Sequence, residues 1–255
     1  MIDSHTHLFL CEKPTVELLE AAAAAGVTRM LNVGLDETTN AEVVAVAEAE
    51  EAVFAAVGRH PNEAGGFDDA AQTALAEFGA HEMVRAIGET GLDFYRDTAA
   101  PADQRRAFAG QIEVAVELGL PIVIHARDKD GESAAVDEIF TTLDARAAGA
   151  TVILHCFSAP QRVADAAERG WYCSFAGNVT YPRSAELRFA AAKVPEDRIL
   201  VETDAPFLTP QVRRGERNEP ANVVATAAVV AAERGVAIEE LERTVEANAR
   251  ALFGW

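Results

Sequence analysis

Short apolar runs and longer helical stretches alternate along the chain. Each apolar run is rich in β-branched residues, a polar or glycine-containing turn follows it, and an alanine-rich stretch comes next. In one such stretch Phe108, Ile112, Ala115 and Val116 recur at the spacing of a single helix face. The pattern predicts eight strands, at residues 2–7, 28–33, 52–57, 84–89, 122–125, 152–155, 171–175 and 199–202. It predicts helices near residues 14–25, 39–50, 68–79, 101–118, 132–147, 160–169, 183–192, 219–234 and 238–252.

Residues at the ends of these stretches support the predicted helices. Pro14 suits a first helical turn, because that position has no backbone hydrogen bond to lose. Thr39 and Glu42 have the spacing of a capping box, which predicts that a helix begins at Thr39. Gly119 follows a helical stretch, where a left-handed cap needs a residue without Cβ.

Eight alternations of strand and helix predict parallel strands joined by helical crossovers. An open doubly wound sheet and a closed (β/α)8 TIM barrel both satisfy this pattern. The strand number and the length of 255 residues favour the barrel, with extra C-terminal helices after the last strand. No linker or change of composition divides the chain, so we expect a single barrel domain over residues 1–255.

Composition and charge restrict the class of protein. The chain is 49% apolar and 25% charged, which is typical of a soluble globular protein. Its formal net charge of −19 opposes non-specific capture of nucleic acid, although bound metal ions could still attract a phosphate ester. Three cysteines form no disulfide framework, and no targeting or membrane-spanning segment is evident. We therefore expect a cytoplasmic protein that neither binds a membrane nor needs an obligate protein partner.

The histidines carry the strongest chemical signal. Four of the six lie in or just after the C-terminal end of a predicted strand, and His60 lies in the turn after another. That end of a β/α barrel carries the active site. One such histidine is most simply a hydrogen-bonded core residue, but four at one rim favour a metal site. The four are His5, His7, His125 and His155.

Two carboxylates at further strand ends complete a possible ligand set. Glu89 could instead pair with an arginine of the barrel, and Asp204 could cap a turn before Pro206. Four imidazoles and two carboxylates suffice for two divalent ions, which we expect to be Zn²⁺, Mn²⁺ or Mg²⁺. Two such ions activate a shared water molecule. Glu89 could bridge them, and Asp204 could be both a ligand and the acceptor of the water proton.

Sequence motifs across nearly the whole chain add a family resemblance. They are Asp-Ser-His-Thr-His at 3–7, Gly-Arg-His-Pro at 58–61, Ile-Gly-Glu-Thr-Gly-Leu-Asp-Phe-Tyr-Arg at 87–96, Leu-Pro-Ile-Val-Ile-His-Ala-Arg-Asp at 120–128, His-Cys-Phe-Ser at 155–158, Glu-Thr-Asp-Ala-Pro-Phe-Leu-Thr-Pro at 202–210 and Arg-Asn-Glu-Pro at 217–220. In this order they resemble the TatD family of metal-dependent deoxyribonucleases, which belongs to the amidohydrolase superfamily.

The resemblance implies a TIM-barrel hydrolase that cleaves phosphodiester bonds in DNA, with 3′–5′ exonuclease action as one form. It implies metal ligation by the six residues named above. It also implies that five more residues contact the substrate or hold the metal ligands in place. These are His60, Arg96, Arg127, Glu202 and Asn218. The two arginines could equally form ion pairs at the rim, and the last two residues could simply order a loop. Glu216 departs from a lysine common in the family, which removes one phosphate contact.

Two other functions stay open. The same superfamily hosts metal-dependent hydrolases of small amides, lactones and phosphate esters, and the charge of −19 favours a small substrate. A non-catalytic module that binds a metal or a partner is the third reading. The complete set of expected ligands argues against it.

Overall fold

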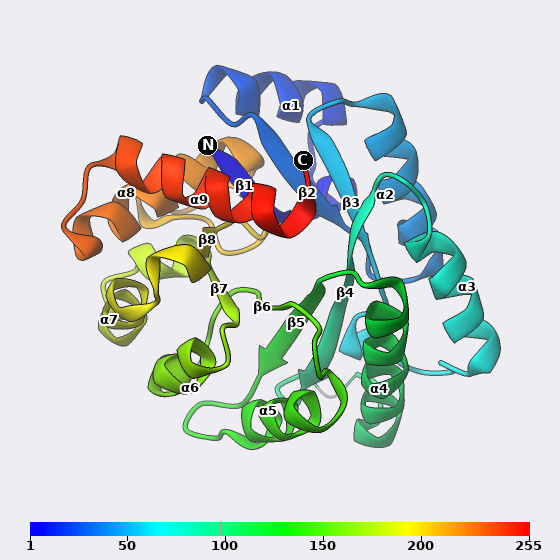
Figure 1. The fold of residues 1–255 in the computed structure, drawn as a ribbon. Coiled ribbons are helices and arrows are strands. Elements are labelled where there is room, and N and C mark those ends of the chain that lie inside the picture. The colour runs from blue at the N-terminus through cyan, green and yellow to red at the C-terminus, as the bar shows by residue number, and fades with distance from the viewer. Residues whose placement is uncertain (97) are drawn as a thin grey trace. The chain divides into compact units, whose positions relative to one another are not determined.

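The computed structural model describes residues 1–96 and 98–255 of the chain, and there it has eight strands in one sheet in the order β1 to β8. The strands are β1 (Ile2–Thr6), β2 (Arg29–Val33), β3 (Val53–Val57), β4 (Val84–Asp93), β5 (Ile122–Arg127), β6 (Val152–Leu154), β7 (Tyr172–Phe175) and β8 (Ile199–Val201). The helices between and after them are α1 (Thr15–Ala24), α2 (Glu37–Ala49), α3 (Asp69–Gly79), α4 (Pro101–Leu118), α5 (Ala134–Arg146), α6 (Val163–Glu168), α7 (Ala185–Lys193), α8 (Val223–Arg234) and α9 (Ile238–Phe253). Strand and helix alternate as the sequence pattern predicts (Figure 1).

The chain divides into two compact units. The first unit comprises Met1–Asn32 and His155–Trp255, and the second unit comprises Val33–Leu154. In the first unit the two ends of the sheet lie side by side. Ser4 Oγ donates a hydrogen bond of 3.0 Å to the Val201 carbonyl, and the backbone N–H of His7 donates one of 2.8 Å to the Ala205 carbonyl. Contact between β1 and the β8 end is what closure of a barrel requires.

Strand β4 of the second unit is longer than the sequence pattern predicts. We expected it to end at Glu89, but it continues to Asp93. Gly91 allows this because its φ is +141° and a Cβ atom there would lie 2.0 Å from the His125 carbonyl oxygen of β5. The absence of a side chain lets the two backbones run together, with Gly91 opposite His125 and Asp93 opposite Arg127.

One predicted helix start is wrong. Helix α2 begins at Glu37, and Asp36 rather than Thr39 is its N-cap. The Asp36 carboxylate accepts a hydrogen bond of 2.8 Å from the Thr39 N–H, and Thr39 Oγ1 accepts one of 2.9 Å from the Asp36 N–H. The capping box therefore exists three residues earlier, because Asp36 and Thr39 satisfy each other's backbone donors.

The predicted C-terminal helices are present as α8 and α9, and α9 packs on β1 and β8. Within the residues described, no single helix is long and apolar enough to cross a membrane. The one helix pair that meets the length and composition criteria together, Pro220–Arg234 with Ile238–Phe253, is bent by 107° at its break.

Candidate functional site

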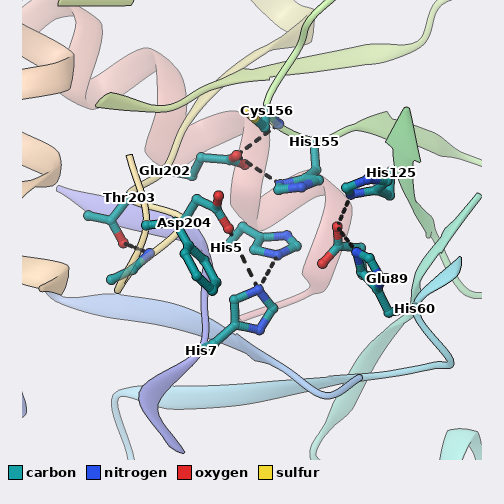
Figure 2. Close-up of polar contacts among 12 residues, drawn as sticks. His5, His7, His60, Glu89, His125, His155, Cys156, Glu202, Thr203 and Asp204 are labelled. Carbon is teal, nitrogen blue, oxygen red and sulfur yellow. Dashed lines mark hydrogen bonds and ion pairs between the residues drawn. The ribbon is translucent and has the colours of Figure 1, made fainter. Parts of the chain in front are cut away.

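Four predicted ligands meet within the first unit. His5 and His7 are two residues apart at the end of β1, so their side chains share one face of the strand. Their Nε2 atoms lie 3.2 Å apart, and both residues are buried. The ring of His155 stacks on the ring of His5 with 3.8 Å between centroids, and Asp204 Oδ1 lies 3.6 Å from His7 Nε2 (Figure 2). We call His5, His7, His155 and Asp204 the first cluster.

The spacing within the first cluster fits a divalent ion. Two nitrogen ligands that each lie about 2.0–2.1 Å from a zinc ion at a tetrahedral angle are about 3.3 Å apart. The 3.2 Å between the Nε2 atoms of His5 and His7 matches this separation. A shared cation also suits two buried imidazoles that turn the same nitrogen toward each other.

Glu202 supports the first cluster from a fully buried position. Its Oε1 accepts a hydrogen bond of 2.8 Å from the Cys156 N–H and lies 2.9 Å from His155 Nδ1 (Figure 2). This contact orients the imidazole through Nδ1, as the carboxylate partner of a metal-ligating histidine does. Its second oxygen, Oε2, has no hydrogen-bond partner among residues 1–96 and 98–255. A buried carboxylate oxygen without a donor is costly, and a nearby cation would compensate for it.

Asp3 and Thr203 connect β1 to the segment after β8. The Asp3 carboxylate accepts hydrogen bonds of 2.8 Å from the Thr203 N–H and 2.5 Å from its Oγ1. Burial raises the pKa of Asp3 to about 8, although the hydrogen bonds from Thr203 oppose this shift. Asp3 therefore has a structural hydrogen-bonding role beside His5 rather than a position in the first cluster.

Asp204 has an unusual backbone conformation. Its φ is +55°, in the left-handed region that non-glycine residues seldom adopt, and its N–H donates a hydrogen bond of 2.9 Å to the His5 carbonyl. Asn218 orders the loop that follows, because its Nδ2 donates to the carbonyls of Thr203 and Phe207 at 2.9 and 2.6 Å. Strain of this kind is retained where the surrounding structure holds it, often at functional sites.

A second cluster lies within the second unit. Glu89 Oε1 lies 2.5 Å from His125 Nδ1 and 3.6 Å from His60 Nε2, so the carboxylate sits between two imidazoles (Figure 2). Asp93 Oδ2 lies 3.3 Å from His125 Nε2. We call His60, Glu89, Asp93 and His125 the second cluster. Its ligand-type atoms from His60, Asp93 and His125 all lie within 4.8 Å of one another.

Asp93 is the residue that our sequence analysis missed, because the predicted strand stopped at Glu89. A signal was present, since Asp93 is four residues beyond Glu89 and shares its face if the strand continues. Its carboxylate accepts hydrogen bonds from Asn62 Nδ2 and from the backbone N–H of Arg96. Burial opposes ionisation of Asp93, but the contact with His125 and these hydrogen bonds outweigh it and hold its pKa below the usual range.

The predicted rim arginines form no ion pair with another residue that the structure describes. In the part of the chain that the structure describes, neither Arg96 nor Arg127 has a carboxylate within salt-bridge distance. The guanidinium carbon of Arg127 instead lies 4.2 Å from the centroid of the Tyr95 ring. Both cations are therefore available for an anionic ligand.

The sequence of the whole chain is similar to proteins of a known family. The sequence model of the family described as TatD related DNase matches residues 2–254. This chain belongs to the TatD family. The TatD-family chain is 39% identical over 264 residues to an uncharacterized metal-dependent hydrolase TatD of Mycobacterium tuberculosis, covering 100% of this chain and 98% of the relative. It is 36% identical over 243 residues to a protein of Cronobacter sakazakii named 3′-5′ ssDNA/RNA exonuclease TatD, covering 93% and 90%.

A solved structure confirms the predicted fold class. The TatD homologue YjjV of Escherichia coli aligns with a TM-score of 0.90 and 27% identity, covering 100% of this TatD-family chain and 98% of YjjV. With eight strands in chain order, this establishes the TIM barrel and excludes the open doubly wound sheet.

Proposed function

We propose that this TatD-family protein is a divalent-metal-dependent phosphodiesterase that degrades single-stranded DNA, as a 3′–5′ exonuclease. The observation that carries the proposal is the buried pair of His5 and His7 nitrogens at a metal-ligand spacing of 3.2 Å. The substrate class is supported by the name of the Cronobacter sakazakii relative, a 3′-5′ ssDNA/RNA exonuclease.

Two divalent ions, of Zn²⁺, Mn²⁺ or Mg²⁺, are part of the proposal. Their proposed ligands are His5, His7, Glu89, His125, His155 and Asp204. Glu89 has two carboxylate oxygens and would bridge the ions. When bound, the ions would acidify a water molecule and orient it toward the phosphorus atom. Imidazole with carboxylate suits Zn²⁺ and Mn²⁺ better than Ca²⁺.

The chain's own residues divide the remaining work. Asp204 would accept the proton of the attacking water, and its side chain is 13% exposed, so water can reach it. Glu202 would hold His155 in the orientation and tautomer that ligation needs. Arg96 and Arg127, which have no carboxylate partner among the residues described, would contact substrate phosphates. His60, which faces Glu89, would lie beside the scissile bond.

The competing function is hydrolysis of a small amide, lactone or phosphate ester, which the net charge of −19 favours. Protein reconstituted with each of the three ions should be tested on 3′-labelled single-stranded DNA, RNA, a small phosphodiester and a panel of amides and lactones. We expect stepwise release of nucleotides from the 3′ end of DNA. Turnover of a small ester or amide without cleavage of DNA would refute the nuclease proposal.

Substitutions of the two carboxylates test their assigned roles. We expect Asp204→Asn to reduce kcat by about 10²–10⁴-fold, the usual contribution of a general base. We expect Glu89→Gln to lower metal occupancy, because the bridge loses its charge. If Asp204→Asn retained both ions and near-native kcat, the assignment of the base would be wrong.

We also propose that residues 1–255 act as one barrel domain in the cytoplasm. The first unit combines segments from both ends of the chain, so neither segment of it is an independent module. Three cysteines that form no disulfide are typical of a reducing compartment.

A further inference from the structure

An exposed aromatic side chain and a cation lie together at the end of β4 and β5. The Tyr95 side chain is 51% exposed, although it belongs to a segment that follows a buried strand. The Arg127 guanidinium stacks on its ring, with 4.2 Å between Cζ and the ring centroid. The pair therefore presents a π surface and a positive charge side by side.

The backbone holds this pair in a defined position next to the second cluster. The Tyr95 N–H donates a hydrogen bond of 3.0 Å to Asp93 Oδ1, and the Phe94 N–H donates one of 2.8 Å to the Arg127 carbonyl. The other carboxylate oxygen of Asp93 lies 3.3 Å from His125 Nε2. Because one buried carboxylate contacts both the turn that carries Tyr95 and the His125 imidazole, the two are positioned together.

Arg127 carries its positive charge in a strongly acidic protein. Acidic residues outnumber basic ones by 41 to 22, and several arginines pair with carboxylates, as Arg105 does with Glu138 and Arg198 with Asp197. Over residues 1–96 and 98–255, the Arg127 guanidinium has no such partner. A cation without an acidic partner in an acidic protein is suited to a ligand that brings its own negative charge.

We propose that Tyr95 and Arg127 form a stacking platform for one nucleobase of a single-stranded nucleic acid, with Arg127 also contacting a neighbouring phosphate. This inference rests on the proposed nuclease function and specifies how the strand is held. Every base has a π face, so a stacking platform tolerates any sequence. A base inside a duplex is already stacked on its neighbours, so the platform favours single strands.

The test compares two substrates that differ only in their bases. One is a single-stranded DNA with a normal 3′ end, and the other carries abasic nucleotides at its last three positions. For Tyr95→Ala we expect KM on the normal strand to rise about 5- to 150-fold with little change in kcat, since a stacked base contributes about that factor. On the abasic strand we expect the variant and the native protein to differ by less than about twofold. Tyr95→Phe should recover most of the affinity, because it keeps the ring.

Two further variants separate stacking from charge and from general effects of surface change. Phe189→Ala is the matched control, because Phe189 is 60% exposed in helix α7 and also has a cation, Lys193, over its ring. We expect it to behave as the native protein on both strands. Arg127→Ala should weaken the binding of both strands and reduce the slope of log affinity against log salt by about 0.7, as expected for one lost phosphate contact.

Binding gives a readout that does not depend on turnover. In an Asp204→Asn background, 2-aminopurine at the 3′ end should lose fluorescence on binding, and Tyr95→Ala should abolish this quenching. If Tyr95→Ala lost equal affinity for the normal and the abasic strand, or if its quenching were unchanged, the stacking platform would be overturned and the nuclease function would stand. Absence of DNA cleavage by the native protein would instead overturn the proposed function itself.

Discussion

Replacement of Glu202 by glutamine tests how the buried carboxylate supports metal binding. The change keeps the size of the side chain and one acceptor oxygen but removes the negative charge. Glu202 contacts His155 Nδ1 at 2.9 Å and the Cys156 N–H at 2.8 Å, so both contacts lose a charged partner. Loss of such a partner behind a ligating histidine usually lowers metal affinity about 10–100-fold. This corresponds to about 1.4–2.7 kcal/mol of binding free energy.

The metal-free protein should respond differently to glutamine and to alanine. Glu202→Gln can still accept the hydrogen bond from Cys156, so we expect its free energy of unfolding to fall by less than about 1.5 kcal/mol. Glu202→Ala removes the carboxylate acceptor of two buried donors, at about 1–3 kcal/mol each, so we expect a loss of about 2–6 kcal/mol. The difference between the two variants isolates the contribution of hydrogen bonding from that of charge.

Metal affinity can be measured by titration calorimetry with Zn²⁺ or Mn²⁺, and stability by urea denaturation of the metal-free protein. Asp36→Ala is the matched control, because it removes the N-cap of α2 and should cost about 1 kcal/mol without altering metal affinity. Native metal affinity in Glu202→Gln would refute the supporting role. A loss beyond about 1000-fold would also refute it and identify Glu202 as a direct ligand.

Three further predictions concern the metal, the backbone and the substrate. Chelation should abolish turnover. Each ion present at 100 times its Kd stabilises the protein by about 2.7 kcal/mol, so removal of each ion should lower Tm by about 5–10 °C, and an unchanged Tm in calorimetry would contradict the proposed metal site. Gly91→Ala should lower the free energy of unfolding by more than about 2 kcal/mol, since its Cβ would lie 2.0 Å from the His125 carbonyl oxygen, and native stability in urea would disprove this close approach. The affinity of an inactive variant for single-stranded DNA should depend only weakly on salt concentration. Glu216→Lys should free Arg213 from its ion pair at 3.7 Å and steepen the slope of log affinity against log salt by about 0.7 for each additional phosphate neutralised. A steep slope before the substitution would reveal a basic track that the charge of −19 does not suggest.

The sequence by itself determined the features that depend on local periodicity. Apolar β-branched runs alternating with helical stretches specified the eight strands, because the two periods are visible in any short window. The spacing of His5 and His7 placed both imidazoles on one face of a strand wherever that strand lies in the fold. Motif order across the chain identified the TatD family, which the family match over residues 2–254 confirms.

The tertiary structure decided the features that depend on contacts between distant segments. The end of β4 could not be predicted from its own residues, because Gly91 is tolerated there only through the approach of β5. The partner of Glu202 was also hidden, since His155 lies 47 residues earlier and meets it only after β6 and β8 have joined the sheet. Local propensity acts over a few residues, whereas strand register and buried polar pairing arise when the whole chain packs.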